Sequence, residues 1–139
     1  MTEKELSGLY WLNRETERLQ RELDELEESV GPKSPILSHS PKGRGKRRFC
    51  IGDLAAEIAD LKALIGLNLQ KVQIERARLE RYIGGIECAE TRLIFRLRHV
   101  GGMTWRRIGD ELHMNHETAR RRHKAHLEKM RQMRQEGVV

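Results

Sequence analysis

The sequence predicts an all-α protein, in which long, coiled-coil-like helices are followed by a C-terminal domain of short helices. Charged residues make up 35% of the 139 residues and aromatic residues only 4%, which suits exposed helices better than a large globular core. Two long stretches place apolar residues at steps of three and four, the spacing of one helix face. After residue 88 the apolar periods become shorter and are separated by residues that commonly cap helices.

The first predicted element is a coiled-coil helix within residues 1–30. Its seam repeats as a heptad with one polar interruption and consists of Leu9, Leu12, Thr16, Leu19, Leu23, Leu26 and Val30. Such a helix needs a partner to cover its apolar stripe. Gly31 and Pro32 end the helix, because proline lacks the backbone N–H that a helix requires.

A basic, disordered linker is predicted for residues 31–52, which are rich in proline, glycine and serine. Its basic run, Lys42 to Arg48, has two interpretations. It is either an arm that contacts phosphates or a minor groove, or a solvated linker that adds only non-specific attraction to a polyanion.

The second long helix is predicted for residues 53–87, with Asp53 as its N-cap and Gly84-Gly85 as its break. Its seam again follows heptad steps and consists of Leu54, Ile58, Leu61, Ile65, Asn68, Val72, Glu75, Leu79, Tyr82 and Ile86. The polar residues on this seam can fix register. The two seams predict either a stalk that joins several chains or a hairpin within one chain.

Residues 88–139 are predicted to form a domain of three helices. The first covers residues 91–100, with an inner face of Leu93, Ile94, Leu97 and Val100, and ends at Gly101-Gly102. Thr104 caps the second helix, Trp105–Leu112, and His113-Met114 form a tight turn with Met114 as an apolar plug. Trp105 either closes the small core, which we favour, or stacks on a ligand.

Asn115 is predicted to cap the third helix, whose buried face consists of Ala119, His123, Leu127 and Met130. The spacing, the plug, the caps and the basic outer face together indicate a helix-turn-helix that places this helix in a DNA major groove. The residues predicted to be exposed on the first turns of this helix are His116, Glu117, Thr118, Arg120, Arg121 and Lys124. Together with Thr104, Arg106, Arg107 and Asn115, they are the candidate DNA-binding residues.

The distribution of charge agrees with a nucleic-acid partner. The net charge is +6, but residues 1–30 carry −5, residues 31–50 carry +6 and residues 104–139 carry +4. The run 120–124 contains four bases and no acid, unlike a charge-balanced solvated helix. A polyanion is therefore expected to bind away from the N-terminal helix.

A family resemblance rests on Leu112–Arg120 and Leu127–Arg131, which look like the C-terminal helix-turn-helix of bacterial sigma factors, region 4 of the sigma-70 type. The whole layout resembles the ArpU/RinA-like group of small phage and prophage transcriptional regulators. The most specific matches are Met103-Thr104-Trp105 and Arg120-Arg121-Arg122-His123, and the resemblance covers residues 88–131.

The resemblance implies that His116, Glu117 and Arg121 read bases and that Arg120 contacts a phosphate. The chain departs from the sigma pattern at His113, which replaces a turn glycine, and at Arg122 and His123, which replace an apolar residue and a glutamate. His116 and Arg121 also differ from the usual base-reading residues, which leaves the preferred DNA sequence open. It also lacks the aromatic-rich segment with which full sigma factors melt promoters, so a full sigma factor is not expected.

These features predict a sequence-specific, double-stranded DNA-binding transcriptional regulator, a phage or prophage activator. It is expected to form a homo-oligomer through its helical stalk, with RNA polymerase as a further candidate partner. The alternative is a DNA-packaging recognition subunit or a coiled-coil scaffold protein. A ring of many subunits, or binding to a packaging motor, would favour the alternative. Transcription from a nearby promoter that rises with this protein would favour the regulator.

Other function classes find little support in the sequence. No catalytic triad, phosphate loop or paired-carboxylate pocket can be assembled, so no enzyme and no cofactor are expected. His123 and His126 lie three residues apart without further ligands, which favours a packed His123 and an exposed His126 over a metal site. No apolar run approaches the roughly 20 residues of a membrane span, and Cys50 and Cys88 form no disulfide framework, so a cytoplasmic protein is expected.

Overall fold

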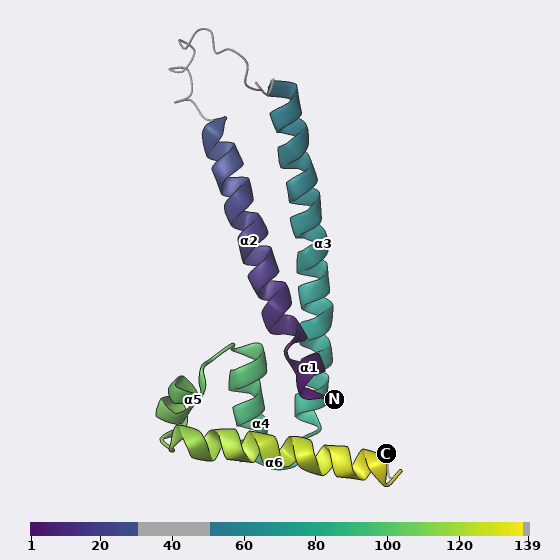
Figure 1. Ribbon diagram of the computed structural model, residues 1–139, viewed down its shortest axis with the longest axis vertical. Coiled ribbons are helices and arrows are strands. Elements are labelled where there is room, and N and C mark those ends of the chain that lie inside the picture. The colour runs from purple at the N-terminus through teal and green to yellow at the C-terminus, as the bar shows by residue number, and fades with distance from the viewer. Residues whose placement is uncertain (31–50, 138–139) are drawn as a thin grey trace. The chain divides into compact units, whose positions relative to one another are not determined.

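The computed structural model describes residues 1–30 and 51–137, and within these ranges the regular structure is entirely helical (Figure 1). The elements are α1 (Glu3–Leu6), α2 (Gly8–Ser29), α3 (Ile51–Gly84), α4 (Ala89–Phe95), the π-helical turn η2 (Arg96–Val100), α5 (Trp105–Leu112) and α6 (His116–Gln135). The predicted all-α class is confirmed. The predicted linker residues 31–50, including the basic run Lys42–Arg48, lie outside the described residues.

The chain divides into two compact units. The first, here the C-terminal unit, combines Met1–Asn13 with Val72–Val139, and the second, here the hairpin unit, is Arg14–Lys71. The first 13 residues of the predicted N-terminal helix therefore belong with the C-terminal helices. This grouping follows from contacts between residues far apart in the chain, which a residue-by-residue pattern does not report.

In the hairpin unit, the parts of α2 and α3 that it contains lie side by side and run in opposite directions (Figure 1). The predicted seams face inward, with Leu23, Ile65 and Asn68 buried. Lys62 Nζ lies 3.5 Å from Glu27 Oε2, an exposed ion pair between the two helices. Of the two arrangements that the seams allow, the structure therefore contains the hairpin within one chain.

The predicted start of the second long helix was two residues late. The helix α3 begins at Ile51, so Asp53 lies in its first turn and is not its N-cap. A carboxylate in the first turn is still favourable, because the amide dipoles there attract negative charge. The predicted break is confirmed, since α3 ends at Gly84.

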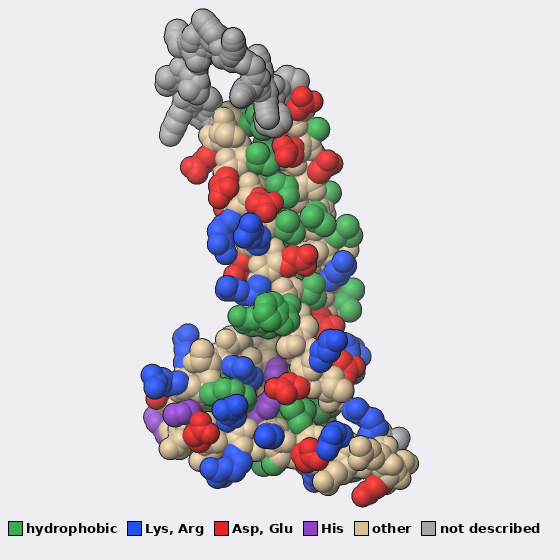
Figure 2. Space-filling view, in the orientation of Figure 1, with side chains coloured by type: hydrophobic (Ala, Val, Ile, Leu, Met, Phe, Trp, Pro, Cys, Tyr) green, Lys and Arg blue, Asp and Glu red, His purple; other side chains and the backbone are tan. Residues whose placement is uncertain are grey.

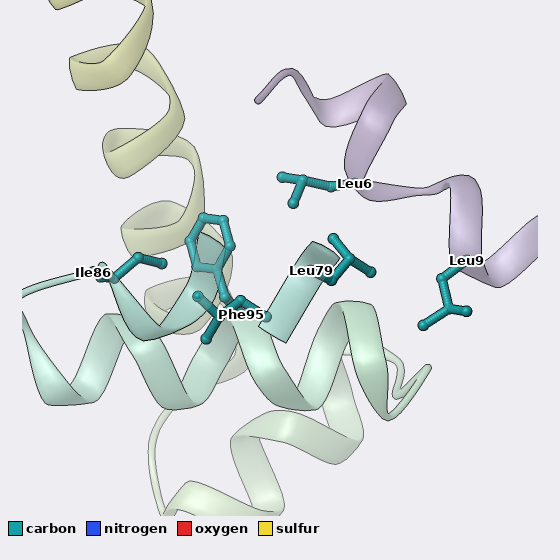
Figure 3. Close-up of a cluster of buried hydrophobic side chains, with 6 residues drawn as sticks. Leu6, Leu9, Leu79, Ile86 and Phe95 are labelled. Carbon is teal, nitrogen blue, oxygen red and sulfur yellow. The ribbon is translucent and has the colours of Figure 1, made fainter. Parts of the chain in front are cut away.

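The C-terminal unit contains a core that joins its N-terminal and C-terminal segments. The buried residues are Leu6, Leu9, Leu79, Ile83, Ile86 and Phe95 (Figure 3). Figure 3 shows that Leu6 and Leu9 come from the N-terminal segment, whereas Leu79 and Phe95 come from α3 and α4. The short α1 is held by a capping box, in which Thr2 Oγ1 accepts from Glu5 N and Glu5 Oε2 accepts from Thr2 N.

A second, smaller core lies between α4, α5 and α6. Ile94, Ile108 and Ala119 are fully buried, and the residues packed around them are Leu97, Met103, Trp105, Leu112 and Met114. The helix α4 serves both cores, because adjacent residues Ile94 and Phe95 point into different clusters. The prediction that Leu93 faces inward was wrong, since Leu93 is 42% exposed and Phe95 takes the buried position.

Candidate nucleic-acid interface

The helix α5 begins at the predicted cap. Thr104 Oγ1 accepts a hydrogen bond from Arg107 N at 3.3 Å, which satisfies one of the backbone donors left free at a helix start. Ile108 and Gly109 are buried, while Thr104, Arg106 and Arg107 are exposed. The buried pair anchors α5 to the core and leaves the two arginines free to reach a ligand.

The turn after α5 depends on two residues with special geometry. His113 has φ 54° and ψ 45°, the left-handed conformation that a glycine adopts most easily. Gly109 is required by close approach, because a Cβ there would lie 2.7 Å from Met114 O and 3.0 Å from His116 N. Met114 N also donates to Gly109 O at 2.9 Å. Together these contacts set the direction in which α6 leaves the turn.

The helix α6 begins at Asn115, as predicted. Asn115 Oδ1 accepts from Glu117 N at 2.8 Å, and Glu117 lies in the first turn, where negative charge is favourable. Ala119 and His123 are buried and Leu127 and Met130 are half-buried, which confirms the predicted inner face. Thr118 was predicted to be exposed and is half-buried instead, because it borders Ala119 on the inner side.

The exposed side chains at the start of α6 form what we call the outer face: His116, Glu117, Arg120, Arg121 and Lys124. Their steps of three and four keep them on one side of the helix. Three are cationic and one is anionic, and His116 Nε2 lies 3.5 Å from Glu117 Oε1. Figure 2 shows Lys and Arg side chains exposed over the region of α5 and α6.

The chemistry of the outer face suits DNA. Arginine can donate two hydrogen bonds to a guanine edge, glutamate can accept from cytosine N4, and lysine can pair with a phosphate. The face lies on a helix whose opposite side is fixed in a core, so its backbone direction does not depend on the ligand. The structure thus brings together five of the ten predicted residues on one helix face and places Asn115 at its cap.

Trp105 is part of the small core, as favoured from its position at a helix start. Its ring packs edge-on against His123, with the centroids 5.0 Å apart, and the Arg98 guanidinium lies 4.6 Å above the ring centroid. Arg98 Nη1 also donates to Met103 O at 2.9 Å. The role of Arg98 was not predictable from the sequence, because no local pattern connects it with a tryptophan seven residues away.

The histidines of α6 differ from expectation in one case. His123 is buried, as predicted, but His126 is half-buried, and its Nε2 atom lies 3.2 Å from Tyr82 Oη. Burial lowers the pKa of His126, with a smaller contribution from Lys129. Within the described residues, no group of three or more metal-binding side chains comes together.

A cleft of about 810 Å³ borders α6 at residues that do not belong to the outer face. Its lining includes Tyr82, Ile86, Cys88, His126 and Met130. Hydrogen bonds with Thr91 lower the pKa of the exposed Cys88 thiol. Arg122, which also lines the cleft, pairs with Glu90 and therefore points away from the outer face.

No family model, curated protein or solved structure matches this chain. None of the helices described in residues 1–30 and 51–137 has the length and apolar character of a membrane span.

Proposed function

We propose that this chain is a non-catalytic protein that binds double-stranded DNA through α5, the His113–Met114 turn and α6, with α6 in the major groove. The observation that carries the proposal is the outer face of α6. Its cationic side chains are exposed, while Ala119 and His123 hold the opposite side of the same helix in a core. That arrangement supports a helix-turn-helix in which the second helix reads DNA.

Eight of the ten candidate residues receive a role from their position. His116, Glu117 and Arg121 lie near the start of α6, where a recognition helix contacts base edges. Arg120 and Lys124 continue the face along the helix and suit phosphate contacts. Thr104, Arg106 and Arg107, at the start of α5, suit contacts with the DNA backbone, as the first helix of such motifs commonly makes.

The finer proposal is a transcriptional regulator of the phage or prophage type, as implied by the resemblance to sigma-70 region 4 and to ArpU/RinA-like proteins. Genome-wide footprinting combined with a reporter for the nearest promoter tests it. A promoter whose transcription changes with this protein supports regulation. Binding confined to one genomic packaging site, without a transcriptional effect, supports the DNA-packaging alternative.

DNA binding itself is tested by reversing the charge of two outer-face residues. The variant R120E/R121E should lose at least tenfold in affinity for a mixed-sequence duplex at low salt, measured by fluorescence anisotropy, because phosphate and guanine contacts are both removed. The matched control is R18E/R21E, which changes the net charge equally but alters exposed residues of α2. Equal affinities for the two variants would refute the assignment of the outer face.

A further inference from the structure

The hairpin unit has a second apolar stripe on α3, beside the seam that faces α2. Leu64 and Leu67 are 43% and 55% exposed, whereas the neighbouring seam residues Ile65 and Asn68 are only 6% and 3% exposed. Figure 2 shows hydrophobic side chains at the surface along this part of α3. Neighbouring exposed apolar side chains are a feature of interaction surfaces.

Exposed charged residues lie on the same side of α3 as the two leucines and extend this stripe in both directions. Steps of three and four connect Glu57, Asp60, Leu64, Leu67 and Lys71, which are all exposed and which we call the α3 stripe. A helix with apolar residues on two adjacent faces suits contact with two neighbouring helices, as in a four-helix bundle. The part of α2 in the hairpin unit has no such second face, because its exposed residues from Arg14 to Ser29 are all polar or charged.

The charges at the ends of the α3 stripe indicate what covers it. Glu57 and Lys71 each lie seven residues, about 10.5 Å, from Leu64, in opposite directions along the helix. A second copy placed antiparallel about Leu64 brings Glu57 of each chain beside Lys71 of the other. A parallel copy would place like charges together. The stripe is therefore complementary to itself only in the antiparallel arrangement.

We propose that the α3 stripe is a self-association surface, on which a second copy of this chain binds antiparallel with Leu64 near the two-fold axis. The same patch is used by both chains, as a two-fold interface requires. Each chain contributes its α2–α3 hairpin, so the pair forms a four-helix arrangement. With two leucines from each chain the interface is small, and we expect a reversible dimer in the micromolar range.

Sedimentation equilibrium of the full chain without DNA tests this proposal. The unmodified protein should form a dimer, and L64E/L67E should remain a monomer at the same concentrations. L69E is the matched control, because Leu69 is 49% exposed on the same helix but lies outside the stripe. Far-UV circular dichroism should show unchanged helicity in all three. A monomeric unmodified chain, or a dimer that L64E/L67E leaves intact, would overturn the proposal.

A charge swap tests the antiparallel register independently of apolar burial. E57K and K71E should each weaken the dimer about tenfold, because each places like charges together at both ends of a two-fold interface. The double variant E57K/K71E should restore the dimer by recreating both pairs with reversed polarity. If the double variant does not recover the affinity of the dimer, the proposed antiparallel register is wrong. Because the readout is mass in the absence of DNA, this result is separate from the outcome for DNA binding.

Discussion

The Nε2 atoms of His99 and His123 lie 2.8 Å apart in the interior of the C-terminal unit. Both residues are buried, and Phe95 stacks on His123 with the ring centroids 4.5 Å apart. Only one of the two atoms can donate in a hydrogen bond, so at least one imidazole is neutral and accepts. The pair links η2 with α6 and so holds the inner side of the proposed DNA-binding helix.

This pair predicts a loss of stability in mild acid. Burial, assisted by Arg98, lowers the pKa of His99 from 6.5 to about 4, and burial, assisted by His99 and Arg98, lowers that of His123 to about 3. Below pH 6.5 the unfolded chain binds protons that the folded chain does not. The stability that depends on the neutral pair is therefore fully present well above pH 6.5 and is lost as the pH falls toward 4.

Urea denaturation at a series of pH values checks this prediction. The comparison is H99L/H123F, in which both partners become apolar and no buried polar atom is left unpaired. The double variant should lose most of the pH dependence between pH 6.5 and pH 4. Identical pH profiles for the two proteins would show that the histidine pair does not contribute to acid sensitivity.

The left-handed conformation of His113 predicts a stabilising substitution. With φ at 54°, the His113 backbone is strained by its Cβ, and glycine relieves that strain. His113→Gly should therefore raise the free energy of unfolding by about 0.5–1 kcal/mol, and His113→Ala should not. Thermal melts of the unmodified chain and the two variants measure the order of their stabilities. A glycine variant less stable than the unmodified chain would contradict the inference that the His113 backbone is strained.

A side chain added at Gly109 should destabilise the protein, in contrast to the stabilising change at His113. Gly109→Ala places a methyl group against Met114 O and His116 N, so the turn must shift, at a cost of about 1–3 kcal/mol. Gly66→Ala on α3 is the control, because a Cβ there meets nothing within 4 Å, and alanine favours a helix interior by about 1 kcal/mol. The denaturation midpoint should fall for Gly109→Ala and rise for Gly66→Ala. Equal shifts would mean that the close approach at Gly109 has no energetic role.

Substitutions of Asn115, the N-cap residue of α6, should affect stability and DNA binding differently. Asn115→Asp keeps an oxygen that accepts from Glu117 N, so stability should remain near that of the unmodified chain, whereas Asn115→Ala should cost about 1 kcal/mol. The aspartate should nevertheless weaken DNA binding, because it adds negative charge at the proposed interface. Melting temperature and duplex affinity, measured on the same samples, report the two effects. An aspartate variant with undiminished affinity would place Asn115 away from the DNA.

Features that depend on neighbouring residues were predictable from the sequence. The two heptad seams, the caps Thr104 and Asn115 and the turn at His113 all follow from periodicity or from the chemistry of a single residue. The outer face of α6 was predictable for the same reason, since an N-cap together with a buried face determines which positions point outward. Thr118 was wrongly predicted to be exposed, because it lies at the border of the two faces.

Features that depend on long-range packing were not predictable. The inward position of Phe95 in place of Leu93 arises because α4 lies between two cores, one of which includes Leu6 from the N-terminal segment. The contact between His99 and His123 joins residues 24 positions apart, on different helices. The local pattern predicted that His123 is buried but did not indicate its partner, and the half-buried position of His126 was missed because its contact with Tyr82 is also long-range.

Methylation interference is the most direct test of the proposal that α6 enters the major groove. Duplexes selected for binding from a random-sequence pool are methylated lightly, which modifies guanine N7 in the major groove and adenine N3 in the minor groove. We expect the bound fraction to be depleted of duplexes methylated at guanine N7 within a short run of base pairs, and we expect R120E/R121E to remove this pattern. Interference only at adenine N3, or at no position, would contradict major-groove docking of α6.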